Sequence, residues 1–266
     1  MSKIYVIAAM RRYDWSSVIL TILADLGFLW VLVYFGLGGL ESTIHLLAGA
    51  GPIAWILLGM VLFLLLFHSD YRTDIPLFFT GFALGYWGEW WGTSREIWTY
   101  WNGETPPEYL PPLWGLGLIT VYRLSQLLSQ LIPEEMPGWQ RRLMIGSFVV
   151  LPLLAFAHSW SLLASVGWNG RLDAHFFLGL VVAGFLILYR FDLRRNFLLY
   201  MCGTCLGGLY EYLGTHFGEW TYITGETPPL WIAPLWGLAC VAMSNLALLA
   251  RAFAQAISRK ASELSG

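Results

Sequence analysis

Charged residues and cysteines are scarce in this chain. Only 12% of its 266 residues are charged, about half the share found in a typical soluble protein. Three cysteines are too few for a disulfide framework. The five histidines form neither an H-x3-H nor an E-x2-H pair, so a di-iron site is not expected. These absences exclude a soluble enzyme domain, a disordered chain and a nucleic-acid binder of the basic-patch kind, and we expect no metal and no cofactor.

Apolar and aromatic residues fill the sequence instead. Hydrophobic residues make up 57% of it and aromatic residues 17%, and the mean hydropathy is +0.60. A helix needs about 20 mostly apolar residues to cross a bilayer. We therefore predict an all-α polytopic membrane protein with about eight transmembrane helices. The predicted spans are Ser16–Phe35, Thr43–Phe67, Ile75–Thr93, Pro112–Ile132, Leu143–Val166, His175–Tyr189, Asn196–Thr215 and Pro234–Phe253.

The positive charges support this count and give an orientation. Eight spans divide the connecting segments between two sides, with Arg123 set aside because it lies inside the fourth span and can snorkel to its end. The rule that positive residues stay inside places the rich side, and both termini, in the cytoplasm of a bacterial or archaeal inner or plasma membrane. One side carries Lys3, Arg11, Arg12, Arg72, Arg141, Arg142, Arg190, Arg194, Arg195, Arg251, Arg259 and Lys260, and the other carries Arg95 and Arg171.

A segment of the chain occurs twice. Residues 85–115 and 207–237 align without gaps at a constant offset of 122, and 16 of the 31 positions are identical. The shared motif reads E-x-x-G-T-x4-W-T-Y-x2-G-E-T-P-P-x4-P-L-W-G. Each half holds four predicted helices. An even number gives the halves the same direction, so we expect a pseudo-two-fold axis along the membrane normal. The expected units are residues 1–132, a cytoplasmic linker at 133–138, and residues 139–266.

The repeated glutamates are the first candidate site. Glu89 and Glu211 lie about 14–15 residues into their spans, or roughly 20 Å at 1.5 Å per residue. An ionisable residue at such depth usually faces the interior of the bundle. A neutral carboxylic acid buried among aromatics can donate a proton or a hydrogen bond. The plainer alternative is a carboxyl group that ties two helices together.

Three further residues are weaker catalytic candidates. Glu104 and Glu226 lie in the repeated Gly-Glu-Thr-Pro-Pro segments. There they can bind a cation, take part in catalysis or hydrogen-bond the amides of a turn. His216, close to Glu211 in the sequence, points to the second half as the more reactive one.

Aromatic residues crowd the repeated segment. Many of them fit the belt that marks a membrane–water interface, but a belt does not require the same positions to repeat. Aromatic faces stabilise positive charge, so these side chains suit either a carbocation or the binding of a long apolar molecule. The repeated pairs, which we predict to bind substrate, are Trp98 and Trp220, Tyr100 and Tyr222, and Trp114 and Trp236.

The second copy resembles the carotenoid-biosynthesis membrane proteins that include bisanhydrobacterioruberin hydratase. The family pattern is E-x-x-G-x-x-x-G-x-Y-x-Y followed by a helix that begins with proline. This sequence departs from it in three places: Trp220 replaces a tyrosine, the Gly-Glu-Thr-Pro-Pro run is not part of the family pattern, and the first copy has Glu96 where Gly218 stands. The matching residues are Glu211, Gly214, Gly218, Trp220, Tyr222, Pro234 and Trp236.

The resemblance implies a hydratase of the lyase class that adds water to an isoprenoid double bond. Glu89 or Glu211 is then the general acid, and tryptophan and tyrosine faces stabilise the tertiary cation. Two alternatives stay open: a non-catalytic subunit that binds pigment or lipid, and a proton-coupled transporter. The expected partners are a lipid-soluble substrate or pigment, the bilayer and other membrane proteins.

Overall fold

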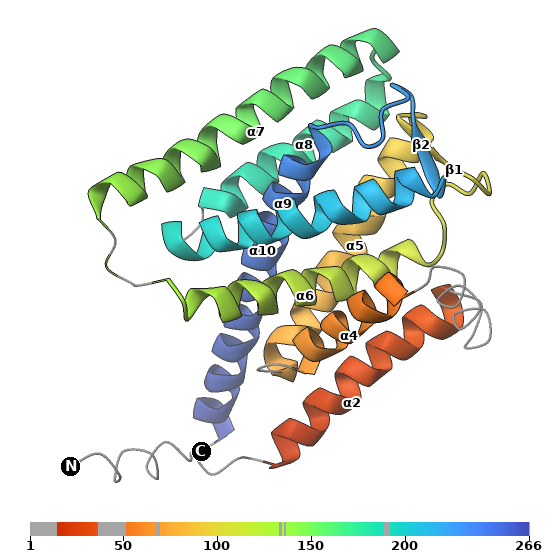
Figure 1. Cartoon of the computed structure of the whole chain (residues 1–266). Coiled ribbons are helices and arrows are strands. Elements are labelled where there is room, and N and C mark those ends of the chain that lie inside the picture. Colours follow the sequence, from red (N-terminus) through yellow and green to blue (C-terminus); the bar gives the residue numbers. More distant parts are fainter. Residues whose placement is uncertain are drawn as a thin grey trace.

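The chain folds mostly as α-helices in the computed structural model (Figure 1). The structure describes residues 15–36, 52–66, 70–132, 135, 137–188 and 192–265, and these ranges hold eight α-helices. The elements are α2 (Trp15–Val31) with its π-helical continuation η1 (Leu32–Gly36), α4 (Pro52–Leu66), α5 (Tyr71–Ser94), β1 (Trp98–Tyr100), α6 (Leu110–Ser129), α7 (Gly138–Val166), α8 (Gly170–Leu188), α9 (Leu193–His216), β2 (Trp220–Tyr222) and α10 (Ile232–Ser265).

Each predicted span has a helix at its place in the sequence. The parts at residues 43–51, 67 and 189 lie outside the described residues. By length and composition, two helices among the described residues can cross a membrane, namely Gly170–Leu188 and the stretch Ile232–Glu263 of α10. The apolar segment Ile19–Tyr34 is shorter. The mostly helical fold is therefore confirmed, whereas eight spans remain a prediction.

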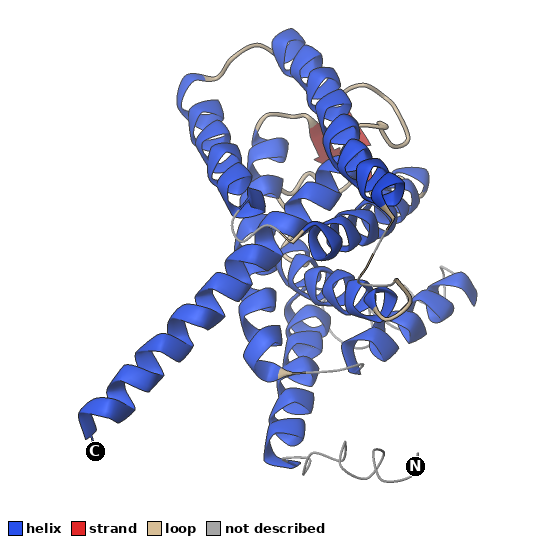
Figure 2. Ribbon diagram, turned by 90° about the vertical axis from the view of Figure 1, so that its left-hand side faces the viewer, coloured by secondary structure: helices blue, strands red, loops and turns tan. Residues whose placement is uncertain are grey.

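Four helices form the centre of the molecule, and they come from corresponding places in the two halves. Helix α5 packs on α6 and α9 packs on α10, and the pairs cross through the contacts α5–α10 and α6–α9. Helices α2 and α4 cover one side of this centre and α7 and α8 the other (Figure 1). The last turns of α10 leave the bundle and are exposed (Figure 2).

A two-stranded ribbon corrects the prediction of a purely α-helical fold. Strands β1 and β2, both Trp-Thr-Tyr, pair antiparallel with Thr99 opposite Thr221 (Figure 2). Their hydroxyl oxygens lie 3.2 Å apart. Main-chain bonds continue the pairing symmetrically, from Trp101 N–H to the Glu219 carbonyl at 3.0 Å and from Ile223 N–H to the Ile97 carbonyl at 2.9 Å. Two identical segments that face each other across a two-fold axis pair antiparallel in this way, and the ribbon joins the halves.

The divergence between Glu96 and Gly218 has a conformational explanation. Both residues follow the end of a helix with positive φ, 53° at Glu96 and 76° at Gly218. At this position the chain leaves the helix through a left-handed residue, which glycine adopts at least cost. The two copies therefore keep one backbone path although the residue differs.

A buried ion pair corrects the expectation that Arg123 snorkels to the membrane surface. Arg123 is 1% exposed and pairs with the buried Asp74 of α5. At the offset of 122, both partners are replaced together, by Asn196 and Asn245. These asparagines donate to the main-chain carbonyls of residues 187 and 186, at 3.2 and 2.9 Å. Arg195 also donates to the Asn245 side chain at 2.9 Å, so in the second half an arginine of α9 contacts two neutral asparagines instead of a carboxylate.

We expect the double variant Asp74→Asn/Arg123→Met to be within about 1 kcal/mol of the wild type, because replacing a whole buried pair is often neutral. The matched single variant Arg123→Met leaves Asp74 buried without its counterion and should lose more stability. Asp25, which lies near the pair, is retained in both. Denaturation in mild detergent measures the difference, and a double variant less stable than the single would contradict the prediction.

Candidate functional site

Glu89 lies in a cage of three hydrogen-bond donors. Its Oε2 accepts from Trp98 Nε1 and from the Tyr100 hydroxyl, both at 2.9 Å. Its Oε1 accepts from Trp114 Nε1 at 3.1 Å. The carboxyl group is buried, with 7% of the residue exposed. One helix, one strand and the start of the next helix thus converge on a single side chain.

Glu211 has the same cage, built from the second copy. Its Oε2 accepts from Trp220 Nε1 at 3.0 Å and from the Tyr222 hydroxyl at 2.7 Å. Its Oε1 accepts from Trp236 Nε1 at 2.7 Å. The sequence predicted two glutamates and six repeated aromatic residues as the site. The structure brings all eight together as two matching groups, each with one glutamate and three aromatic donors.

The spacing of glycines on α5 explains how the cage is assembled. Gly85, Glu89 and Gly92 are four and three residues apart, so they share one face of the helix. A Cβ at Gly85 would lie 2.2 Å from the Trp114 ring, and one at Gly92 would lie 2.0 Å from the Trp98 ring. Each glycine leaves room for one indole, and the glutamate between them accepts from both.

The two cages contact each other through their aromatic rings. The Trp114 and Trp236 rings stack with centroids 3.8 Å apart and an interplanar angle of 6°. On the ribbon, Trp98 lies against Tyr222 at 5.8 Å and Tyr100 against Trp220 at 5.7 Å. The donors of one carboxylate therefore pack on the donors of the other.

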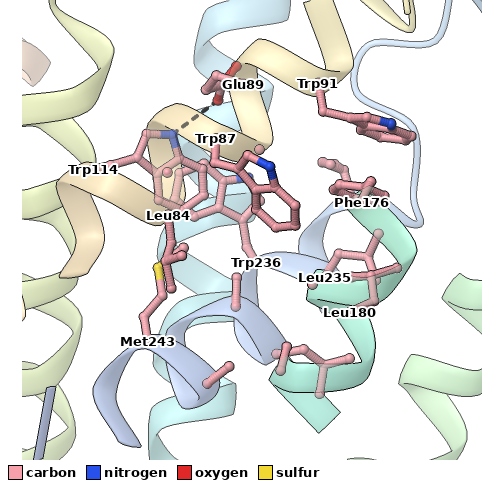
Figure 3. Close-up of a pocket in the computed structure, with 18 of the residues that line it drawn as sticks. Leu84, Trp87, Glu89, Trp91, Trp114, Phe176, Leu180, Leu235, Trp236 and Met243 are labelled. Atoms are coloured by element: carbon pink, nitrogen blue, oxygen red, sulfur yellow. Dashed lines mark hydrogen bonds between the residues drawn. The ribbon is translucent and has the colours of Figure 1, made fainter. Parts of the chain in front are cut away.

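A cavity of about 830 Å³ opens beside the cages, mainly between α5, α8 and α10, and both glutamates line it (Figure 3). No Lys, Arg or Asp of the described ranges is among its lining residues. Figure 3 shows Glu89 and Trp91 towards one end of the view and Met243 towards the other, with Trp87 between Glu89 and Met243. The cavity is thus a long apolar space with acidic groups near the ribbon.

The cavity does not follow the symmetry of the cages. Trp87 and Trp91 of α5 contact α8, where Trp91 stacks on Phe176 at 3.6 Å and Trp87 fills the space beside Gly179. The positions 122 residues later are Leu209 and Leu213. In addition, Gly88 lines the cavity where the other copy carries Tyr210. The repeated motif therefore builds the cages, and residues that differ between the copies shape the cavity.

Asp173 was not among the sequence candidates, although it fixes the N-terminal end of α8. It accepts from Trp91 Nε1 at 3.1 Å and forms an ion pair with Arg95 Nε at 3.1 Å. It also accepts from the Asn169 amide at 2.7 Å. An aspartate in the first turn of a helix is a recognisable capping signal, but its long-range partners are set by the tertiary structure.

The three weaker candidates lie outside the cavity. Glu104 and Glu226 are exposed in turns that each contain a cis Thr–Pro bond, and their main-chain amides donate to Asn102 and Thr224. His216 is exposed and stacks on Tyr212 at 5.4 Å. Their proposed catalytic roles stay predictions.

The ribbon tyrosines are held in their protonated form. Burial raises the pKa of Tyr100 and of Tyr222 well above the ordinary value of 10, and the nearby carboxylates of Glu89 and Glu211 raise both pKa values further. Burial raises the pKa of Tyr109, just before α6, to about 12. These phenols therefore stay hydrogen-bond donors well above neutral pH.

We expect the protein to lose stability as the pH rises from about 10 to about 12. Above pH 10 a tyrosine in the unfolded chain loses its proton, whereas folded Tyr109 retains it up to about pH 12. The stability contribution is thus complete below pH 10 and lost as the pH rises through the folded pKa. Thermal unfolding over this range measures the loss, and Tyr109→Phe should reduce its slope. An unchanged midpoint from pH 10 to 12 would contradict the expectation.

No protein-family model matches the chain, and searches of curated proteins and of solved structures also find no match. Within the described ranges, no group of three or more His, Cys, Asp or Glu side chains is placed to hold a metal ion. The site is therefore interpreted from its own geometry.

Proposed function

We propose that the chain is an integral membrane protein with eight spans, arranged as two parallel four-helix repeats about an axis along the membrane normal. The outer helices support this with apolar side chains that point away from the bundle, such as Leu23 at 60%, Leu154 at 63% and Phe185 at 70% exposure. Soluble proteins rarely expose apolar surface on this scale. The uneven distribution of Lys and Arg orients both termini to the cytoplasm.

Within the membrane, we propose that the protein binds a long apolar molecule of the isoprenoid or carotenoid type. The observation that carries this is the cavity of about 830 Å³, which is lined by aliphatic and aromatic side chains and reaches both caged glutamates. Ligand sites are typically apolar clefts of this size with a few polar groups that fix orientation. The ligand chain would lie between α8 and α10, with one end at the cages.

Mass spectrometry and an absorption spectrum of what co-purifies in mild detergent test the binding. Gly88 lines the cavity and an added Cβ there meets open space. The variant Gly88→Tyr introduces the side chain that the other copy carries, and should expel the bound molecule. Gly27→Leu, at an exposed position of α2 outside the cavity, is the control. Equal ligand content in wild type and Gly88→Tyr would refute the proposal.

Catalysis by the same cavity is a second candidate, because both carboxyl groups face the space where the ligand would lie. A protonated carboxyl group would transfer its proton to one alkene carbon, which leaves a tertiary cation against the indole faces. Water would then add to the cation, and its released proton would return to the carboxylate. The net reaction is hydration of the double bond.

The arrangement of donors weighs in favour of binding over this reaction. Each glutamate accepts three hydrogen bonds, two from indole N–H groups and one from a tyrosine hydroxyl. Of these donors, only the tyrosine hydroxyl also has a lone pair that can accept a hydrogen bond from the acid. These bonds occupy three of the roughly four acceptor positions of each carboxyl group, so both glutamates are already engaged in holding the cages together. Turnover of a polyene by purified protein, abolished in Glu211→Gln and retained in Glu226→Gln, would establish the catalytic alternative, whereas no turnover by wild type would exclude it.

A further inference from the structure

Trp231 lines the cavity and has a buried indole N–H without a hydrogen-bond partner among the described residues. The residue is 6% exposed. Five other indoles of the cavity wall have hydrogen-bond partners, since four of them donate to Glu89 or Glu211 and Trp91 donates to Asp173. Trp231 is therefore an exception within an otherwise satisfied group of donors.

The unpaired donor lies next to the second cage. The Trp231 ring contacts the Tyr222 ring edge to face, with centroids 6.0 Å apart. The Tyr222 hydroxyl in turn donates to Glu211. The first copy has Tyr109 at the corresponding position, and Tyr109 does not line the cavity. The donor therefore belongs to the asymmetric part of the site, where the cavity meets the ribbon.

A buried donor without a partner lowers stability unless a ligand or water supplies an acceptor. An oxygen atom on the ligand would accept from Trp231 Nε1. Glu211 uses three of its roughly four acceptor positions, so one remains for a ligand that can also donate. A hydroxyl group both accepts and donates. A ligand carboxylate, in contrast, would lie beside two glutamates in a cavity where no Lys or Arg of the described ranges could offset its charge.

We propose that the polar end of the ligand is a hydroxyl group, held between Trp231 Nε1–H and the Glu211 carboxylate, so that the protein selects long-chain alcohols over hydrocarbons and acids. This selection rests on the proposed binding function. In this proposal Trp231 determines which polar group the end of the ligand carries. The apolar walls of α8 and α10 bind the chain of the ligand.

Native mass spectrometry of the protein in nanodiscs tests this with three probes of equal chain length: an isoprenoid alcohol, its parent hydrocarbon and its carboxylic acid. Wild type should bind the alcohol about tenfold more tightly than the hydrocarbon, the factor that one good hydrogen bond supplies, and the acid least tightly. Trp231→Phe should remove the preference for the alcohol and leave hydrocarbon binding unchanged. Trp87→Phe alters the same wall without removing a buried unpaired donor, so it should weaken both ligands alike.

Two results would overturn the inference, and they separate it from the proposed function. If wild type binds alcohol and hydrocarbon equally, ligand selection by Trp231 is wrong while the apolar binding site stands. If no probe binds wild type and Gly88→Tyr behaves identically, both proposals fail. The comparison of probes on wild type needs no variant, so a poorly folded Trp231→Phe protein does not prevent a decision.

Discussion

Replacing Glu89 by alanine is expected to destabilise the protein strongly, because one buried and two partly buried donors lose the acceptor that they share in the described part of the chain. Trp98, Tyr100 and Trp114 all donate to this side chain. The cost is ~1–3 kcal/mol for an unsatisfied buried donor and less for a partly buried one, so the loss is on the order of 2–6 kcal/mol. Unfolding in mild detergent, followed by tryptophan fluorescence, measures it.

A graded series makes this prediction specific to the cage. Glu89→Gln keeps one carbonyl oxygen but turns an amide N–H towards a donor, so its stability should fall between those of wild type and Glu89→Ala. The matched control is Glu104→Ala, which removes the same charge from an exposed turn and should change stability by less than about 0.5 kcal/mol. Similar losses in Glu89→Ala and Glu104→Ala would show that the cage does not stabilise the fold.

Gly85→Ala is expected to have the second largest effect, although it adds a single methyl group. The new Cβ would lie 2.2 Å from the Trp114 ring, which must then move away from Trp236. Overpacking of this kind costs about 1–3 kcal/mol. The change should also weaken the near-ultraviolet circular dichroism that arises from the stacked indole pair.

Gly88→Ala is the matched control, because it lies on the same helix and an added Cβ there meets no atom within 4 Å. Alanine favours the helix over glycine by about 1 kcal/mol, so this variant should be at least as stable as wild type. Gly207→Ala should lose about as much stability as Gly85→Ala, because its Cβ would lie 2.4 Å from the ring of Trp236, the other indole of the stacked pair. A stable Gly85→Ala protein with an unchanged spectrum would contradict the proposed packing.

The two cages could be predicted from the sequence because residues 85–115 occur again as residues 207–237, and the two copies can be compared. Glu89 and Glu211 stand out through identical aromatic residues at identical offsets, and those residues are their hydrogen-bond partners. The helices were likewise predictable, because long apolar stretches set their positions. The contacts within a helix leave an apolar pattern in the sequence, and the contacts within a cage occur in both copies and so leave a repeated motif.

The ribbon and the cavity were not predictable in the same way. Trp, Thr and Tyr all favour strands, but three residues are too few to predict one, and the segment pairs because the other copy faces it. The cavity depends on how α8 lies against α5, through contacts such as Trp91 with Phe176. These residues are 85 positions apart by number, and nothing local relates them.

The buried ion pair did leave a signal in the sequence. Asp74 and Arg123 both become asparagine at the offset of 122, and a joint change of two charges indicates that they are partners. Without that comparison, an arginine near the end of a span resembles the common snorkelling type. The joint replacement of Asp74 and Arg123 by asparagine therefore predicts the ion pair better than the position of Arg123 alone.

An experimental density map of the protein in lipid nanodiscs, purified without exposure to harsh detergent, directly tests whether the cavity holds a long apolar molecule. We expect continuous density for an elongated molecule between α5, α8 and α10, with one end beside Glu211 and Trp231. The same map of Gly88→Tyr should lack this density. A cavity filled only by water, or an elongated molecule bound elsewhere with this space closed by side chains, would show that the cavity is not the binding site.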